Sequence, residues 1–300
     1  MCTYICRFVI LMRKISYTVP PALDGSSVAA VLRSHGFSTA LLRSLKKTYG
    51  ALCRNNCPVR TVDPVHTGDM VAVELNTDGA TAPPSAEKAV IVYADRDILV
   101  VNKRAGMAMY ETYNHHGNAL SNAVAAAGFD GPFRPIYRLD KDTSGLVVLA
   151  RHRLSAAKLA GRVQKDYYAV VPGAYTGSGT VDAPIAHCPD STVKRQVDPA
   201  GVRAVTHWEA LGQQGGRTLL RVQLETGRTH QIRVHMAYIG HPILGDTVYG
   251  RKKPELGQSS QCLHAGALCF QHPRDGHPVM VFDELPPYFR DVLDKLEKMK

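Results

Sequence analysis

The chain has 300 residues, of which 45% are hydrophobic, and it carries 36 Lys/Arg against 26 Asp/Glu, a formal net charge of +10. This hydrophobic content excludes wholesale disorder, and the length favours one large domain with a smaller one. The positive charge is typical of proteins that bind a polyanion such as RNA. A basic surface on a soluble protein without such a partner is the alternative.

The first segment is apolar but interrupted by Arg7. It is too short to span a bilayer, and it lacks the basic segment and small-residue cleavage site of a signal peptide. Because Met12 begins a more ordinary sequence, residues 1–11 are predicted to be an extension. We expect a cytoplasmic protein with no membrane segment.

Seven cysteines are scattered along the chain, an odd number with no CxxC pair. The pairs Cys2/Cys6 and Cys53/Cys57 have the spacing of zinc half-sites, but no second pair of ligands with matching spacing stands nearby. Free thiols in a reducing compartment are therefore expected, and no metal site.

Residues 1–76 are predicted to form a small basic domain. Asp24 or Ser26 can cap a first helix and Ser38 a second, because their side-chain oxygens accept from free backbone N–H groups. Short strands are expected around Gly68. The segment holds nine Lys/Arg and four Asp/Glu, a net charge of +5. Basic residues on or near the second helix are Arg43, Lys46 and Lys47. The domain therefore either contacts RNA or is merely a structural accessory.

A segment rich in Gly, Pro and small residues predicts a linker at 77–93, followed by a second domain at 94–300. Periodicity and end signals within this domain predict a strand at 97–103, a helix at 118–128, antiparallel strands at 202–211 and 218–225, and a final helix that begins at Pro286 or Pro287.

A carboxylate among cations is the most informative feature of the second domain. Asp140 stands between Arg138 and Lys141, before a turn and an apolar run at 146–150 that is typical of a buried strand. Nearby positive charge favours the ionised carboxylate, which suits a nucleophile or a general base. A surface ion pair has the same pattern, so the segment alone leaves both interpretations open.

Two later segments carry further candidate side chains. Lys165 and Tyr167 enter a β-branched run, which by itself indicates sheet packing. Arg228, His230 and Arg233 cluster around the start of a predicted helix, with Thr229 as its expected N-cap. A helix start attracts anions, although a lone arginine there usually faces solvent.

Three sequences, in this order, resemble signatures of the RluA-type pseudouridine synthases, which isomerise uridine in ribosomal and transfer RNA: RLDKDTSG at 138–145, KDYYA at 165–169 and TGRTHQIR at 226–233. The likeness covers residues 94–290. The chain departs from the family where Tyr137 replaces the usual histidine, so Tyr137 is assigned no catalytic role. The N-terminal domain is loosely similar to a small RNA-binding domain of a ribosomal protein.

The resemblance implies roles at the matching positions. Asp140 would be the essential catalytic residue, Arg233 its ion-pair partner, and Tyr167 the ring that stacks on the target base and takes part in proton transfer. No cofactor or metal is implied. The residues expected to hold RNA are Arg138, Lys141, Lys165, Arg228 and His230, with Arg43, Lys46 and Lys47 of the first domain.

The expected fold is α+β, a mixed and mainly antiparallel sheet with flanking helices, plus a small N-terminal α/β domain. The expected activity is isomerisation of specific uridines in structured RNA after base flipping. Large-subunit ribosomal RNA is the first expected substrate, with transfer RNA as the alternative. We expect a monomer without an obligate protein partner. Whether Asp140 attacks the sugar or removes a ribose proton stays open.

Two other functions fit parts of the sequence. A non-catalytic RNA-binding protein on this fold would not need the three signature side chains to converge. A nucleoside or glycosyl hydrolase acting on small substrates would not need a basic domain, and its binding would not weaken steeply with salt.

Overall fold

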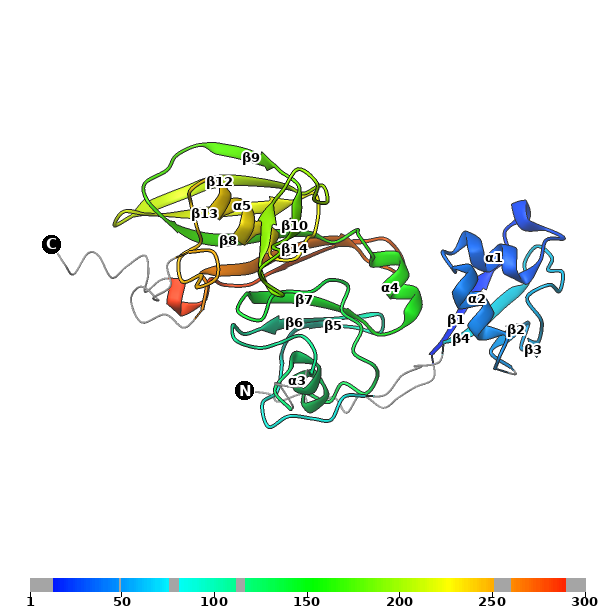
Figure 1. Ribbon diagram of the computed structural model, residues 1–300. Helices are drawn as coiled ribbons and strands as arrows, with labels where there is room; N and C mark the ends of the chain where they lie inside the picture. Colours follow the sequence, from blue (N-terminus) through cyan, green and yellow to red (C-terminus); the bar gives the residue numbers. More distant parts are fainter. Residues whose placement is uncertain (1–12, 49, 76–80, 112–116, 251–259, 290–300) are drawn as a thin grey trace.

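The computed structural model describes residues 13–48, 50–75, 81–111, 117–250 and 260–289. The predicted extension at 1–11 and most of the predicted final helix lie outside these residues, although a helical turn does begin at Pro287. The described chain forms a small N-terminal domain beside a larger α+β domain (Figure 1). No helix in the described segments is long and apolar enough to cross a membrane.

The N-terminal domain is a four-stranded sheet, in the order β1-β4-β2-β3, with two short helices. Its elements are β1 (Arg13–Thr18), a 3-10 turn (Pro21–Leu23), α1 (Val28–Ser34), α2 (Thr39–Leu45), β2 (Leu52–Arg54), β3 (Cys57–Pro58) and β4 (Met70–Leu75). Ser38 caps α2 as predicted, but Ser27 caps α1 in place of Asp24 or Ser26. Asn55 and Asn56 both have positive φ, which suits the tight turn between β2 and β3.

The larger domain is built on a nine-stranded sheet in the order β5-β6-β7-β14-β8-β13-β12-β9, with β15 paired to β14. Its strands are β5 (Val90–Ala94), β6 (Ile98–Lys103), β7 (Ser144–Ala150), β8 (Gln164–Pro172), β9 (Ser178–Asp182), β12 (Val205–Gln214), β13 (Arg217–Leu224), β14 (Leu263–Gln271) and β15 (Pro278–Phe282). The β14–β7 pairing is parallel and the other described pairings are antiparallel, which confirms the expected mixed sheet.

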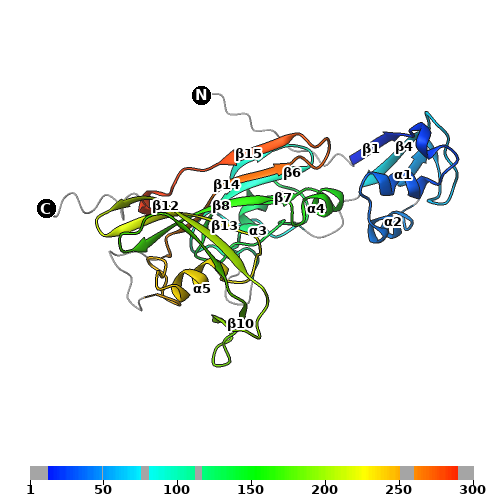
Figure 2. The same ribbon diagram turned by 90° about the horizontal axis from the view of Figure 1, so that it is seen from above.

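Within the described residues, three helices with complete bounds and a hairpin join this sheet. They are α3 (Leu120–Ala126), α4 (Arg153–Leu159), α5 (Gln231–Tyr238) and the hairpin of β10 (Ile185–His187) and β11 (Arg195–Val197). Figure 2 shows α5 and the hairpin on the same side of the sheet. The strands predicted at 97–103, 202–211 and 218–225 correspond to β6, β12 and β13.

The segment predicted as a linker is partly structured. β5 begins inside it, at Val90, and the preceding residues lie along α3, where the N–H groups of Ser85 and Ala89 donate to the carbonyls of Asn122 and Ala123. On the other side of the domain, Leu154 of α4 joins the apolar core of the N-terminal domain. The two domains are therefore in contact through α4, the helix that faces the N-terminal domain in Figure 1.

α5 begins one residue later than its predicted cap would place it. His230, in the left-handed conformation with φ 57°, is the N-cap in place of Thr229. The side chain of buried Gln231 instead fixes the loop before the helix, since its oxygen accepts from the N–H of Arg228 and the hydroxyl of Thr226. The helix is buried on several faces, so Arg233 does not face solvent.

Candidate active site

Asp140 lies in a tight turn just before β7, an interior strand of the sheet between β6 and β14. The N–H of Thr143 donates to the carbonyl of Asp140 at 3.2 Å, and the neighbouring Leu139 is buried in the core. Gly145 has φ 116°, and a Cβ there would collide with the backbone of Ala265 on β14. Glycine is therefore required where the turn enters the parallel strand pair.

Arg233 on α5 holds two carboxylates at once. Its Nη1 donates to Asp140 Oδ2 at 3.2 Å, while Nε and Nη2 donate to the two oxygens of Asp246 at 2.7 and 3.0 Å. The Asp246 side chain is 0% exposed and that of Asp140 is 25% exposed. The fork of the guanidinium thus fixes the position of a carboxylate that solvent can still reach.

The buried charges stabilise one another. Burial acts to lower the pKa of Arg233, but the hydrogen bonds and charges of Asp246 and Asp140 outweigh it and leave that pKa raised. Burial acts to raise the pKa of Asp246, yet Arg233 and the N–H groups of Tyr249 and Val248 hold it below its usual value. Both side chains therefore stay charged at neutral pH.

Tyr167 enters the same region from β8. It is 6% exposed and lies opposite Val222 and Ala265 on the neighbouring strands. Burial, with the charge of Asp140 adding to it, raises the pKa of its hydroxyl. The group is therefore neutral at physiological pH and able to donate a proton in a hydrogen bond.

His230 also faces the carboxylate, with its Nε2 3.9 Å from Asp140 Oδ2. Its Nδ1 lies 2.8 Å from the hydroxyl of Tyr249. Burial lowers the pKa of His230, against an opposing effect of Asp140, so the ring is neutral at neutral pH. The αL backbone at this position turns the ring toward the turn that carries Asp140.

A buried lysine holds the Asp140 turn through a hydrogen bond to its backbone. Lys103, at the end of β6, is 0% exposed, and its ammonium donates to the carbonyls of Arg104, Met107 and Lys141 at 3.1, 2.9 and 2.8 Å. Burial lowers its pKa to about 7. Because Lys141 follows Asp140 directly, this contact ties the turn to the sheet.

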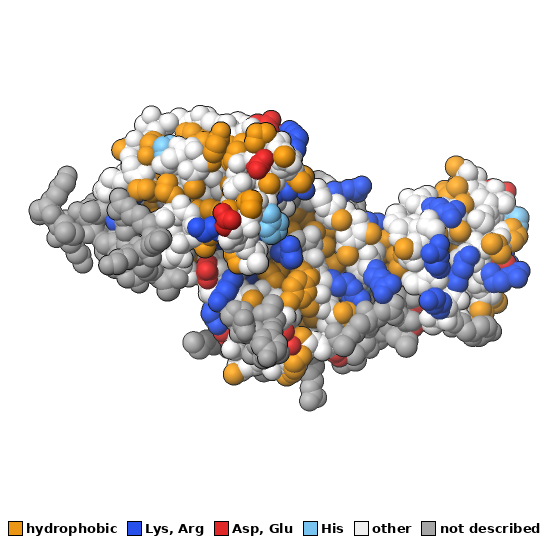
Figure 3. Space-filling model, viewed as in Figure 1, with side chains coloured by type: hydrophobic (Ala, Val, Ile, Leu, Met, Phe, Trp, Pro, Cys, Tyr) orange, Lys and Arg blue, Asp and Glu red, His pale blue; other side chains and the backbone are white. Residues whose placement is uncertain are grey.

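The remaining predicted RNA-binding residues differ in their surroundings. Arg138 and Lys141 are exposed beside Asp140, and Arg228 is exposed with its Nε bonded to a carbonyl at 3.0 Å. Lys165 is half-buried, and its ammonium donates to a carbonyl and lies 4.6 Å from the centre of the Tyr137 ring. In the N-terminal domain, the three candidate RNA-binding residues, Arg43, Lys46 and Lys47, are all exposed. Lysine and arginine side chains spread over the visible face of that domain (Figure 3).

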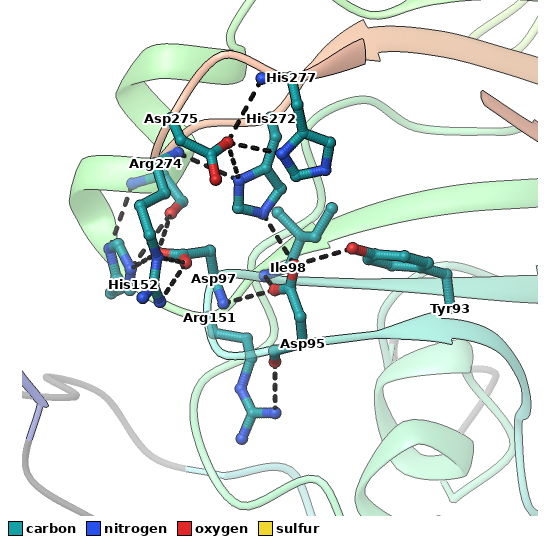
Figure 4. Close-up of polar contacts among 11 residues, drawn as sticks. Tyr93, Asp95, Asp97, Ile98, Arg151, His152, His272, Arg274, Asp275 and His277 are labelled. Carbon is teal, nitrogen blue, oxygen red and sulfur yellow. Dashed lines mark hydrogen bonds and ion pairs between the residues drawn. The ribbon is translucent and has the colours of Figure 1, made fainter. Parts of the chain in front are cut away.

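A second polar cluster lies away from Asp140, where three turns meet at the ends of β5, β7 and β14 (Figure 4). Asp275 accepts from His272 at 3.2 Å and from His277 at 2.6 Å, and the two imidazole rings stack with centroids 4.6 Å apart. Arg274 and His152 both contact the buried Asp97. These groups have ligand chemistry for a metal, but they already satisfy one another through hydrogen bonds and ion pairs. We interpret the cluster as a structural tie.

Comparison with known proteins decides the family. Residues 97–238 match the family model described as RNA pseudouridylate synthase. The RNA pseudouridine synthase YjbO of Bacillus subtilis is 38% identical over 250 residues, covering 79% of this chain and 88% of that protein. The ribosomal large subunit pseudouridine synthase D of Xylella fastidiosa is 35% identical over 296 residues, covering 90% and 88%. The chain belongs to the RluA-type pseudouridine synthase family.

The fold agrees with this family assignment. The solved structure of human RNA Pseudouridylate Synthase Domain Containing 1 is 28% identical, with a TM-score of 0.57, and covers 71% of this chain and 89% of that one. The α+β fold expected from the sequence is therefore confirmed. In this pseudouridine synthase, the structure brings together Asp140, Tyr167, His230 and Arg233, which are far apart in the sequence.

Sequence reasoning missed three residues of the synthase site. Lys103 was expected only as the end of the strand at 97–103, and no role was assigned to Asp246 or Tyr249, which lie in the sequence GHPILGDTVYG at 240–250. An acidic residue and a tyrosine directly after the helix that carries Arg233 were the available signal. Their partners could not be identified without knowing how that loop folds back on the helix.

Proposed function

We propose that this chain isomerises specific uridines in structured RNA, with Asp140 as the catalytic residue. The observation that carries the proposal is the buried fork of Arg233, which holds Asp140 at a position reachable from solvent beside a neutral Tyr167. Large-subunit ribosomal RNA is the substrate we favour. In support, several relatives at 35–41% identity are named ribosomal large subunit pseudouridine synthase D.

The reaction exchanges one bond to the ribose for another. The bond between uracil nitrogen 1 and the anomeric carbon breaks, the base turns, and its carbon 5 bonds to the anomeric carbon. Carbon 5 loses its hydrogen as a proton and nitrogen 1 gains one, so that no oxidant or reductant is consumed. A base inside a helix cannot turn in this way, so the target must first be flipped out of the stack.

The named side chains have complementary tasks in this proposal. Asp140 acts on the ribose, either by attack at the anomeric carbon or by removal of the hydrogen on the adjacent carbon. Tyr167 stacks on the flipped uracil, an interaction of about 1–3 kcal/mol per base, and its neutral hydroxyl is available for proton transfer. Arg138, exposed next to Asp140, is suited to fill the space that the base vacates.

The two routes for Asp140 are separable by experiment. Deuterium on the ribose carbon that bears the 2′-hydroxyl slows the removal of that hydrogen but leaves direct attack at the anomeric carbon almost unchanged. A primary isotope effect on single-turnover rates supports the proton-removal route, and its absence supports the covalent one.

RNA is further held by exposed cations of both domains. We propose that residues 1–76 form an RNA-binding domain, that 77–93 connect it, and that 94–300 form the catalytic domain. The basic residues proposed to contact phosphate are Arg43, Lys46, Lys47, Lys141, Lys165, Arg228 and, beside them, His230. Lys165 would have to leave its present carbonyl and aromatic contacts to do so.

Release of tritium tests the proposal. Ribosomal RNA carrying tritium at uridine carbon 5, from cells lacking this protein, is incubated with the purified chain and with Asp140→Asn. We expect the native chain to release tritium to water and form pseudouridine, and Asp140→Asn to bind the RNA without release. Free uracil in place of pseudouridine would identify a hydrolase, and no reaction with intact binding would favour a non-catalytic RNA-binding protein.

A further inference from the structure

Tyr249 contacts three polar side chains on the α5 side of Asp140, those of His230, Arg233 and Asp246. Its hydroxyl lies 2.8 Å from His230 Nδ1, and its ring lies under the guanidinium of Arg233 at 5.1 Å from the centroid. Its backbone N–H donates to Asp246 Oδ1 at 3.1 Å. No direct contact between Tyr249 and Asp140 is found among the described residues, and the sequence alone assigned Tyr249 no role.

The same hydroxyl joins the site to the β10–β11 hairpin. The backbone N–H of Arg195, on β11, donates to the Tyr249 oxygen at 2.9 Å. The ladder of the hairpin does not need this N–H, since its neighbouring bond runs from Cys188 N–H to the carbonyl of Lys194. Tyr249 also packs against a small core made by the hairpin and Val234 of α5. Figure 2 shows the hairpin projecting from the sheet beside α5.

These contacts determine which nitrogen of His230 carries the proton. Burial raises the pKa of Tyr249, so its hydroxyl keeps its hydrogen. That oxygen accepts from the N–H of Arg195, and if it also accepted from His230 its own hydrogen would lose the acceptor 2.8 Å away, so donation to His230 Nδ1 is the favoured arrangement. A neutral ring that accepts at Nδ1 carries its hydrogen on Nε2, the nitrogen that faces Asp140.

We propose that Tyr249 is a positioning residue that holds His230 in the tautomer whose Nε2–H faces Asp140 and thereby couples the hairpin to the catalytic turn. This inference rests on the proposed function, because it assigns a second support to the Asp140 carboxylate beside Arg233. The opposite tautomer would direct a lone pair at the carboxylate and repel it. A shift of the hairpin is therefore transmitted to Asp140 through one hydroxyl.

The first test replaces Tyr249 with phenylalanine, which keeps the ring under Arg233 and removes the hydroxyl alone. On tritiated ribosomal RNA we expect kcat to fall roughly fivefold, the size of one neutral hydrogen bond, with KM nearly unchanged. Tyr238→Phe is the matched control, because Tyr238 is 62% exposed at the end of α5. Equal thermal melting of the two variants excludes a folding defect.

A titration of His230 separates positioning from mere packing. The hydroxyl that donates to Nδ1 stabilises the neutral ring, so its loss raises the pKa of His230. We expect the His230 ring signal in NMR to titrate at higher pH in Tyr249→Phe than in Tyr238→Phe. The charged groups that face this ring in both variants are Asp140, Arg233, Asp246 and Arg195.

A second variant tests the hairpin link without altering Tyr249. Arg195→Pro removes the guanidinium and the backbone N–H and also restricts φ, whereas Arg195→Ala removes the side chain beyond Cβ and keeps the N–H, so their comparison reports mainly on the backbone at this position. We expect a lower kcat for Arg195→Pro than for Arg195→Ala. We also expect the loss in Arg195→Pro combined with Tyr249→Phe to be smaller than the product of the separate losses.

The proposal is overturned if Tyr249→Phe has the kcat and the His230 titration of Tyr238→Phe, or if the titration alone is unchanged. It also fails in its hairpin part if Arg195→Pro and Arg195→Ala have equal kcat. The proposed function is judged separately, by tritium release from the native chain and its loss in Asp140→Asn. If the native chain and Tyr249→Phe release tritium at equal rates, only the positioning role of Tyr249 is refuted.

Discussion

At the scale of single residues, the site depends on one guanidinium that serves two carboxylates with different surroundings. Asp246 is fully buried and is satisfied by Arg233 and backbone N–H groups, whereas Asp140 takes only the remaining Nη1 and is partly open. The buried carboxylate therefore orients the arginine, and the arginine orients the open carboxylate. Such layered support is what keeps a reactive group in one geometry.

Replacing Arg233 with lysine tests this geometry. A single ammonium cannot reproduce the planar fork that reaches both Asp246 oxygens and Asp140 together. We expect Arg233→Lys to lower kcat/KM on RNA by about 100-fold or more, with RNA binding retained. Arg162→Lys, at an exposed position, is the control. A rate close to that of the native chain would show that charge alone is sufficient.

Lys103 makes stability depend on pH. Its pKa falls from 10.5 in the unfolded chain to about 7 in the folded one, so between these values the unfolded state binds more protons. Stability should therefore rise with pH from about 7 to about 10.5, by at most about 1.4 kcal/mol per pH unit from this group. Urea unfolding at several pH values measures the slope.

Lys103→Met should reduce that slope, because the titrating group is gone. It should also be less active, since the Lys141 carbonyl next to Asp140 loses its donor. An unchanged slope would mean that the buried ammonium titrates as it does in water.

At the scale of elements, local patterns predicted the parts that depend on neighbours in sequence. The alternation in β12 and β13, the apolar run of β7 and the Ser38 cap of α2 are local signals, and the structure has each of them. The αL cap at His230 was not predictable, because Gln231 supports it through contacts with Thr226 and the distant β12.

For the candidate site too, the residues in local sequence signatures were predictable, and those that depend on distant contacts were not. Asp140, Tyr167 and Arg233 belong to signatures long enough to be recognised, whereas Lys103 and Tyr249 acquire partners only when distant segments meet. A lysine at the end of a strand is commonly exposed, and only the three carbonyls that converge on Lys103 make its burial favourable.

The close approach of β7 to β14 at Gly145 predicts how a substitution there changes the stability of the fold. Gly145→Ala should destabilise the fold by about 3 kcal/mol, because φ is positive and the new Cβ would meet the backbone of Ala265. Gly212→Ala, at a bulge in β12 with open space around it, is the control and should change stability little. Chemical denaturation compares the two. Equal stabilities would contradict the described close approach of the strands.

At the scale of the whole molecule, a basic N-terminal domain rests on α4 of the catalytic domain through a shared apolar core. Gly36 of the first domain also lies against the side chain of Lys158 on α4. On the proposed function, RNA held by cations of the first domain would thereby be kept close to the larger domain. Its contribution should be electrostatic and sensitive to salt.

Removing three cations tests that contribution. Arg43→Ala, Lys46→Ala and Lys47→Ala combined should weaken RNA binding and reduce the dependence of log affinity on log salt, by roughly 0.7–0.9 for each phosphate that is no longer neutralised. Their alanines leave the buried face of α2 untouched. The control removes Lys88, Arg96 and Arg162, which are exposed cations outside that domain. Equal effects of the two triple variants would place no specific RNA-binding surface on α2.

The central claim is that Asp140 converts uridine to pseudouridine in cellular RNA. Chemical mapping of pseudouridine in total RNA, from cells that make the native chain and cells that make only Asp140→Asn, tests it most directly. We predict that one or a few sites in large-subunit ribosomal RNA disappear in the variant while all other sites remain. Identical maps, with the variant present at native levels, would contradict the claim.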